Sequence, residues 1–433
     1  MQHLKRILDL LSFRRESRTA IGASGSVALP DVYAHRHEHA QDNALPVTTS
    51  QLSTPEPYLF LFQIIVNPEI YDTIFDMSSA RTLVRLLRTC HTTNQSVRSY
   101  MRRAFNINRR LSRYFPDPIA FRYLQACTGM LISGSTALQF FDRTFYPESD
   151  LDLYVAMPWG SNIGHFVLGH GYQFMPTPVQ PRDFDAAISH PRVTTAGARY
   201  GNFKGIAGVF TFEKGQPGGR KLKVQIMVAV RSPMEIILQF HSTCVLNVIA
   251  FDKAYCLYPR ATLEERLMVV CTTRNDDVIE GVYRRYVQRG WFLIRGFHAM
   301  HLFSLDRSLS SINRWIDDRF SWSILLPYDF QDGITSINSQ TDPLTQDPVS
   351  VSGWTLTARG NGINDPAAIE FHRVEDRDLF YHYVLESNLA LHTPSMIHLM
   401  DMATVANKNG THDQRYIDNR FIHLVRAYYE GRF

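Results

Sequence analysis

The 433-residue chain has few cysteines, almost no net charge and no long hydrophobic run. Its five cysteines are widely spread and form no Cys-x-x-Cys pair, which argues against a disulfide framework and suits a reducing compartment. No apolar stretch approaches the roughly 20 residues that cross a bilayer, so we expect no membrane partner. These absences favour a cytoplasmic or nuclear protein.

The charge balance also limits the partners that can be inferred. The formal net charge of +4 is small for this length, so it does not indicate a nucleic-acid partner, although it leaves room for a local basic groove. The sequence lacks the Gly-x-x-x-x-Gly-Lys-Ser/Thr loop that cradles phosphates in many nucleotide-binding proteins. The chain is long enough for two domains or more, and its 27 Phe and 20 Tyr can form sizeable hydrophobic cores.

The most informative pattern is a Gly-Ser pair followed by an Asp-x-Asp. Gly134 and Ser135 lie between a predicted apolar strand and a predicted helix, and Asp150 and Asp152 lie on a second apolar strand. Because side chains alternate along a strand, both carboxylates share one face and repel each other. Mg²⁺ relieves that repulsion, and the first N–H groups of a helix suit a phosphate. The pattern predicts phosphoryl or nucleotidyl transfer, and the alternative is a turn followed by a solvated acidic strand.

In order and spacing, these four residues resemble the nucleotidyltransferase superfamily of the DNA polymerase β type. The resemblance covers about residues 119–300 and implies an α+β fold with a mixed sheet. It also implies that Asp150 and Asp152 bind Mg²⁺ and that a nucleoside triphosphate contacts Ser135 and the backbone at Gly134. Lys221 or Lys223 would then neutralise phosphate charge.

The chain departs from the family pattern at the third carboxylate, which activates the attacking hydroxyl in that family. On the predicted strand 221–228, Gln225 occupies the expected position. An amide oxygen ligates a metal weakly, but an amide is no general base. We therefore expect nucleotide binding with slow or absent transfer. The alternative is a degenerate relative that serves as a scaffold.

Before this core, residues 1–56 are rich in Ser, Thr, Pro and His without periodicity, and we expect a disordered lead-in. Residues 57–118 are predicted to form short helices. Their Pro-Glu-Ile at 68–70 and the Leu-rich helix that follows resemble an F-box. This resemblance implies an adaptor that docks on a subunit of a cullin-type ubiquitin ligase. The alternative is a helical lid on the core.

Two further expectations concern the rest of the chain. Five arginines of the helical segment, Arg102, Arg103, Arg109, Arg110 and Arg113, either meet phosphates or form a solvated face. Residues 301–433 are predicted to be a mostly helical extension with helices over 310–320 and 414–429, interrupted by a long loop near 331–353. A helix is also predicted over 263–270.

Overall fold

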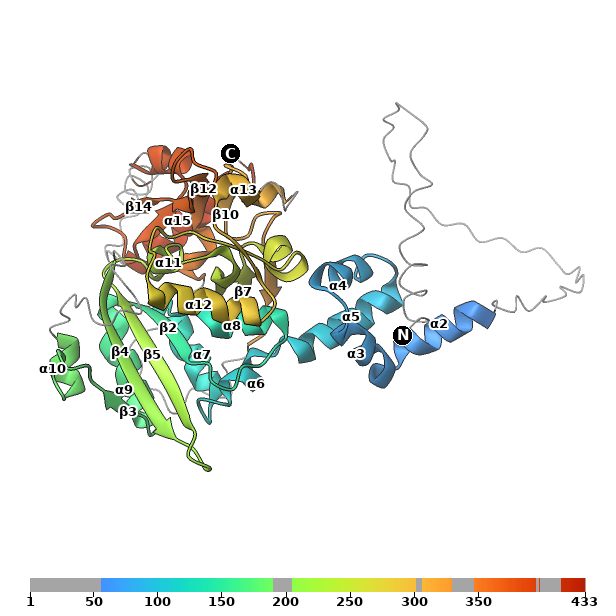
Figure 1. The fold of residues 1–433 in the computed structure, drawn as a ribbon, viewed down its shortest axis with the longest axis horizontal. Coiled ribbons are helices and arrows are strands. Elements are labelled where there is room, and N and C mark those ends of the chain that lie inside the picture. The colour runs from blue at the N-terminus through green and yellow to red at the C-terminus, as the bar shows by residue number, and fades with distance from the viewer. Residues whose placement is uncertain are drawn as a thin grey trace, which may run out of the picture. The chain divides into compact units, whose positions relative to one another are not determined.

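The computed structural model describes residues 56–189, 205–300, 306–328, 346–394, 397 and 414–432 (Figure 1). The predicted lead-in, apart from Glu56, lies outside the described residues. Residues from Glu56 onward form one compact unit. No helix within the described ranges is long and apolar enough to cross a bilayer.

The core contains a mixed sheet of eight described strands. β2 and β5 are parallel, whereas the other neighbouring pairs are antiparallel. Figure 1 shows β4 and β5 as a long hairpin. In spatial order the strands are β11 Trp322–Leu325, β7 Lys253–Cys256, β6 Asn247–Ile249, β1 Leu131–Ser133, β2 Leu151–Ala156, β5 Lys221–Ala229, β4 Ile206–Gly215 and β3 Gln173–Met175. The expected α+β class with a mixed sheet is confirmed.

The alternation along β2 and β5 divides the core into two layers. Leu151, Leu153 and Val155 pack on one side of the sheet, whereas Tyr154 and Met227 pack on the other. Because both faces of the central strands are buried, apolar residues occur at nearly every position of these strands. The helices of this region are α7 Pro118–Thr128, α8 Gly134–Asp142, α9 Gly160–Gly169, α10 Phe184–Ser189, α11 Pro233–Ile237, α12 Asp277–Gln288 and α13 Phe297–Met300.

The helical N-terminal segment has a small core of its own, formed by Tyr71, Phe75, Leu83, Leu86, Val97 and Tyr100. Pro68 begins α3, and the hydroxyl of Ser79 caps α4 by accepting from Thr82 N. Ile70 is 41% exposed, so this side chain and the buried Leu83 do not form one docking face. The helices are α2 Glu56–Val66, α3 Pro68–Asp76, α4 Ala80–Leu86, α5 His91–Ala104 and α6 Ile107–Leu111.

One arginine joins this segment to the core. Arg143 follows α8 and donates to the carbonyl oxygens of Phe75 (2.7 Å) and Ser78 (2.6 Å), and to the Tyr100 hydroxyl (2.7 Å). One guanidinium thus bonds to two backbone carbonyls and a hydroxyl at and just after the end of α3. The attachment is therefore polar and specific.

The C-terminal segment is richer in strands than we predicted. The expected helix over 310–320 is wrong: Asn313–Trp315 form β10, and Arg314 is fully buried, with its guanidinium bonded to Asp318 and to the carbonyl of Leu257. Asp318 also accepts from the backbone of Phe320 and Ser321, which closes a turn where a helix was expected. The remaining strands are β12 Gly353–Ala358, β13 Ala367–Glu370, β14 His372–Val374 and β15 Tyr383–Leu385.

Other expectations for this half of the chain have mixed outcomes. The helix near the C-terminus is confirmed as α15 Gln414–Tyr429. The helix predicted over 263–270 is wrong, because Leu267–Val269 form β8, which pairs in parallel with β9 Phe292–Ile294. Most of the predicted long loop lies outside the described residues, and its described end contains the short 3₁₀ helix η7 Pro348–Val351.

Candidate functional site

Five of the residues singled out in the sequence line one cleft. Gly134, Ser135, Asp150, Asp152 and Gln225 surround a cavity of about 170 Å³ at the end of the central strands. The other lining residues are Glu148, Ser149, Tyr154, Phe240, His241, Val245, Val282, Arg285, Tyr286 and Arg289. The expected grouping of the Gly-Ser pair with the Asp-x-Asp strand is therefore present in the fold.

Strand pairing sets the positions of these groups. Ser133 at the end of β1 pairs with Asp152 on β2, so the Gly134-Ser135 pair begins α8 beside that carboxylate. Asp152 in turn pairs with Gln225 on the parallel strand β5. The hydroxyl of Thr136 donates to Asp150 O at 2.7 Å and ties the first turn of α8 to the start of β2.

Gly134 lies directly beside the Asp152 carboxylate. Gly134 has φ of +68°, and a Cβ at this position would lie 2.8 Å from Asp152 Oδ2. Both facts exclude a larger residue, since L side chains disfavour this φ and the carboxylate fills the space. The glycine thus lets a carboxylate approach the positive end of α8.

The two candidate lysines differ in their surroundings. Lys223 donates to Asp150 Oδ2 at 3.0 Å, and both side chains are largely shielded from solvent. Lys221 instead pairs with Glu213 at 2.8 Å near the hairpin turn, and it does not line the cleft. Lys223 therefore belongs to the site through Asp150, whereas Lys221 lies outside it.

The position beside the two carboxylates is an amide. Gln225 is buried and donates to the Thr211 hydroxyl at 3.2 Å. Among the described residues, no group of three or more His, Cys, Asp or Glu side chains could hold a metal. Two carboxylates nevertheless fit Mg²⁺, which usually keeps several waters and binds through one or two carboxylates and substrate phosphates.

The cleft also contains cationic groups that the motif did not include. Arg285 lines it from the last turn of α12, and Arg289 lines it from the position directly after that helix. The two arginines are four residues apart, a spacing that could have marked them in the sequence. The Arg289 guanidinium lies 3.9 Å from the centre of the Tyr146 ring, which holds it over an aromatic face.

His241 is a further cleft residue that the sequence motif did not include. It lines the cleft, and its Nδ1 lies 2.8 Å from the Ser242 hydroxyl oxygen. Burial lowers its pKa to about 4, with a smaller contribution from the nearby positive charge of Arg285. The imidazole is therefore neutral at physiological pH.

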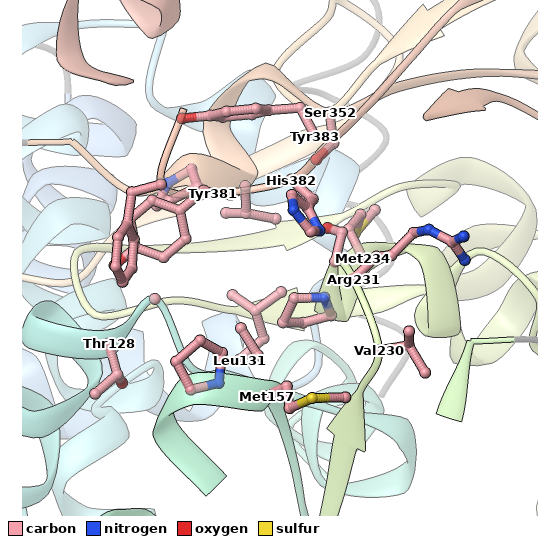
Figure 2. A pocket seen from close by; sticks show the side chains of 18 residues that line it. Thr128, Leu131, Met157, Val230, Arg231, Met234, Ser352, Tyr381, His382 and Tyr383 are labelled. Atoms are coloured by element: carbon pink, nitrogen blue, oxygen red, sulfur yellow. The ribbon is translucent and has the colours of Figure 1, made fainter. Parts of the chain in front are cut away.

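A larger cavity of about 440 Å³ lies at the other end of the same strands (Figure 2). Its walls include Leu131, the first residue of β1, and Met157, which follows β2. Figure 2 shows the rings of Tyr381 and His382 facing them from the C-terminal segment. No carboxylate is among its described lining residues, so its chemistry differs from that of the Asp150–Asp152 cleft.

Comparison with known proteins gives no match to a family model, to a curated protein or to a solved structure.

Proposed function

We propose that the chain binds a nucleoside triphosphate together with Mg²⁺ in the cleft that contains Asp150 and Asp152. One observation carries the proposal: Asp150, directly before β2, and Asp152, on β2, line one cleft with Gly134 at the beginning of α8, and Asp152 lies beside that glycine. This arrangement brings together ligands for a hard cation and backbone N–H groups that suit a phosphate. The nucleotidyltransferase resemblance in the sequence points to the same ligand.

The charged and phosphate-facing residues of the site have distinct roles in this proposal. Asp150 and Asp152 hold Mg²⁺, which on binding neutralises part of the triphosphate charge. Ser135 and the first N–H groups of α8 contact the β and γ phosphates. Arg285 and Arg289, which also line the cleft, supply further positive charge. Lys223 must share or release Asp150 when the metal binds, because it already bonds to that carboxylate.

We propose that nucleotidyl transfer by this cleft is slow or absent. Gln225 replaces the carboxylate that would accept a proton, and an amide cannot do so. Glu213 on the hairpin is paired with Lys221 and does not line the cleft. Binding and transfer are thus separable properties of this site.

Calorimetry tests the binding proposal. ATP, GTP, CTP and UTP are titrated into the full chain with and without Mg²⁺. We expect at least one triphosphate to bind only with the metal, and Asp152→Asn to abolish this binding. Asp185→Asn is the control, because Asp185 is an exposed carboxylate of α10 paired with His165. The absence of binding at millimolar concentration for all four triphosphates contradicts the proposal.

An exposed apolar surface favours a second candidate function, that of an F-box adaptor. On α2 and α3, and directly after them, Leu61, Phe62, Val66, Ile70 and Met77 are all exposed. Adjacent exposed apolar side chains often mark a protein-docking surface. If the segment is an adaptor, the full chain binds the adaptor subunit of a cullin-type ligase, and Phe62→Asp with Ile70→Asp abolishes binding. Leu325→Asp is the control, because it also replaces an exposed apolar side chain by a carboxylate, but on β11 and outside this surface.

A further inference from the structure

A second polar cavity adjoins the proposed nucleotide site. It has a volume of about 470 Å³ and lies between the helices α5 and α6 and the connection from α8 to β2. Five arginines and a single carboxylate, Asp76, are among its described lining residues. The arginines are Arg103, Arg109, Arg110, Arg113 and Arg143. This excess of one charge sign contrasts with the small net charge of the whole chain.

The fold holds several of these arginines in place through backbone carbonyls. Arg110 donates to Gln139 O at 2.7 Å, and Arg113 donates to the carbonyls of Tyr146 and Pro147. Neutral carbonyls orient a guanidinium but do not cancel its charge. Burial lowers the pKa of Arg110 to about 10, which still leaves it charged at neutral pH. Arg103 is paired with Asp72, so the fixed positive charge of the cavity comes from the other four arginines.

Arg109 completes this set from a more exposed position. Its backbone N–H donates to the side-chain oxygen of Asn106, which caps α6, whereas its guanidinium has no bonded partner within the part of the chain that the structure describes. A cation at the rim of a positive cavity is repelled by its neighbours unless an anion binds there. Arg109 is thus the side chain most available to a ligand.

The rim also carries an exposed aromatic ring. Phe145 is 63% exposed, and the Arg113 guanidinium lies 5.0 Å from its ring centre. Arginines interleaved with aromatic rings are typical of surfaces that bind single-stranded nucleic acid, because bases stack on rings and phosphates meet the cations. A small polyphosphate would contact the arginines but has no base to stack on the Phe145 ring.

The arginine cavity adjoins the cleft. Ser149 lines both, and Thr136, which lines the arginine cavity, donates to the backbone of Asp150. The connection from Arg143 to Ser149 therefore separates two sites that lie side by side. A chain of phosphates bound by the arginines could run directly to the carboxylates.

We infer that the arginine cavity binds the phosphodiester backbone of single-stranded nucleic acid, with a base stacked on Phe145. Its role as the partner strand of a nucleotide site rests on the proposed function. Binding of the strand itself needs neither Mg²⁺ nor a triphosphate.

Fluorescence anisotropy with a labelled strand of about 12 nucleotides, oligo(U) or oligo(dT), tests the inference without Mg²⁺ or triphosphate. We expect the full chain to bind, and Phe145→Ala to weaken binding about fivefold or more, the low end for loss of one stack. Phe292→Ala is the control, because Phe292 is equally exposed on β9 and lies outside the cavity. Preference for oligo(U) or oligo(dT) identifies the type of strand.

Variants that change the charge of the cavity give a second test of strand binding. Arg109→Glu should abolish most binding, whereas Arg102→Glu should not, since Arg102 is exposed on α5 and does not line the cavity. Arg109→Ala should reduce the slope of log K against log salt by about 0.7, the value for one lost phosphate contact on a single strand. Equal losses for Arg102→Glu and Arg109→Glu overturn the inference.

The two proposals fail separately. If no strand binds the wild type while calorimetry detects a triphosphate, the inference about the arginine cavity is wrong and the proposed function stands. If strands bind as expected but no triphosphate does, the proposed function is wrong and strand binding stands. Arg109→Glu should leave triphosphate binding unchanged, because Arg109 does not line the cleft.

Discussion

Lys223 Nζ lies 3.0 Å from Asp150 Oδ2, so a lysine neutralises one of the two carboxylates that we propose as Mg²⁺ ligands. The pair lies on adjacent parts of the sheet, with Lys223 on β5 and Asp150 directly before β2. A metal at Asp150 must compete with this cation. The competition gives the site a measurable signature.

Replacement of the lysine should strengthen metal binding. Lys223→Met removes both the competing ion pair and a positive charge near the metal. We expect Mg²⁺ affinity to rise about two- to fivefold, since such a pair costs about 0.5–1 kcal/mol to break. Competition against Mn²⁺ measures the change. Lys221→Met, which removes the Glu213 pair outside the cleft, should have no effect; a similar rise in both variants would contradict the assignment.

Gly134→Ala should impair the site beyond its backbone strain. The new methyl group would lie 2.8 Å from Asp152 Oδ2 and would displace that carboxylate. Gly218→Ala is a matched control, because Gly218 has φ of +81° and no atom within 4 Å of its ideal Cβ. Both variants should lose about 1 kcal/mol of unfolding free energy to strain. Only Gly134→Ala should also lose Mg²⁺ binding; retained binding would show that the close approach is unimportant.

Gln225→Asp should raise nucleotidyl transfer. It places a carboxylate beside Asp152, its partner on the neighbouring strand. A general base typically contributes about 10²–10⁴-fold, so we expect a gain of that order if transfer occurs. Incorporation of a labelled nucleotide into a single strand measures the rate. Thr211→Asp, one strand further from Asp152, should give no gain. Equal rates for Gln225→Asp and the wild type would contradict this role for position 225.

Asp347→Asn should change the pH dependence of stability. Burial raises the pKa of Asp347 to about 8, and the negative charge of Asp252 acts in the same direction. The folded state therefore retains a proton that the unfolded state loses, so this contribution to stability falls as pH rises from about 4 to 8. The neutral variant should be about 2–4 kcal/mol more stable than the wild type at pH 8, and little different at pH 4.

Urea unfolding at both pH values tests this prediction. Asp347 Oδ1 caps η7 by accepting from Val349 N, a role that an asparagine can keep. Asp306→Asn is the control, because Asp306 caps the 3₁₀ helix η5 Arg307–Leu309 in the same way. A stabilisation of Asp347→Asn that is equal at both pH values would contradict a titrating Asp347.

Local patterns predicted the cleft better than the surrounding architecture. The alternation at Asp150 and Asp152 and the Gly-Ser pair depend on neighbours in sequence, so their placement was accessible. Arg143 and Arg314 have roles that depend on carbonyls far along the chain, and no local pattern identifies those partners. The apolar run at Leu267–Val269 suits a buried helix and a buried strand alike, and only its pairing with β9 decides between them.

The most direct test of the nucleotide proposal is to locate the metal. Crystals of the full chain are grown with Mn²⁺, which prefers the same oxygen ligands as Mg²⁺, and a non-hydrolysable triphosphate. We predict an anomalous peak bridged by the carboxylates of Asp150 and Asp152, with phosphate density at the beginning of α8. A triphosphate bound with its metal elsewhere, or the Lys223–Asp150 pair intact with no metal beside it at saturating Mn²⁺, would contradict the proposal.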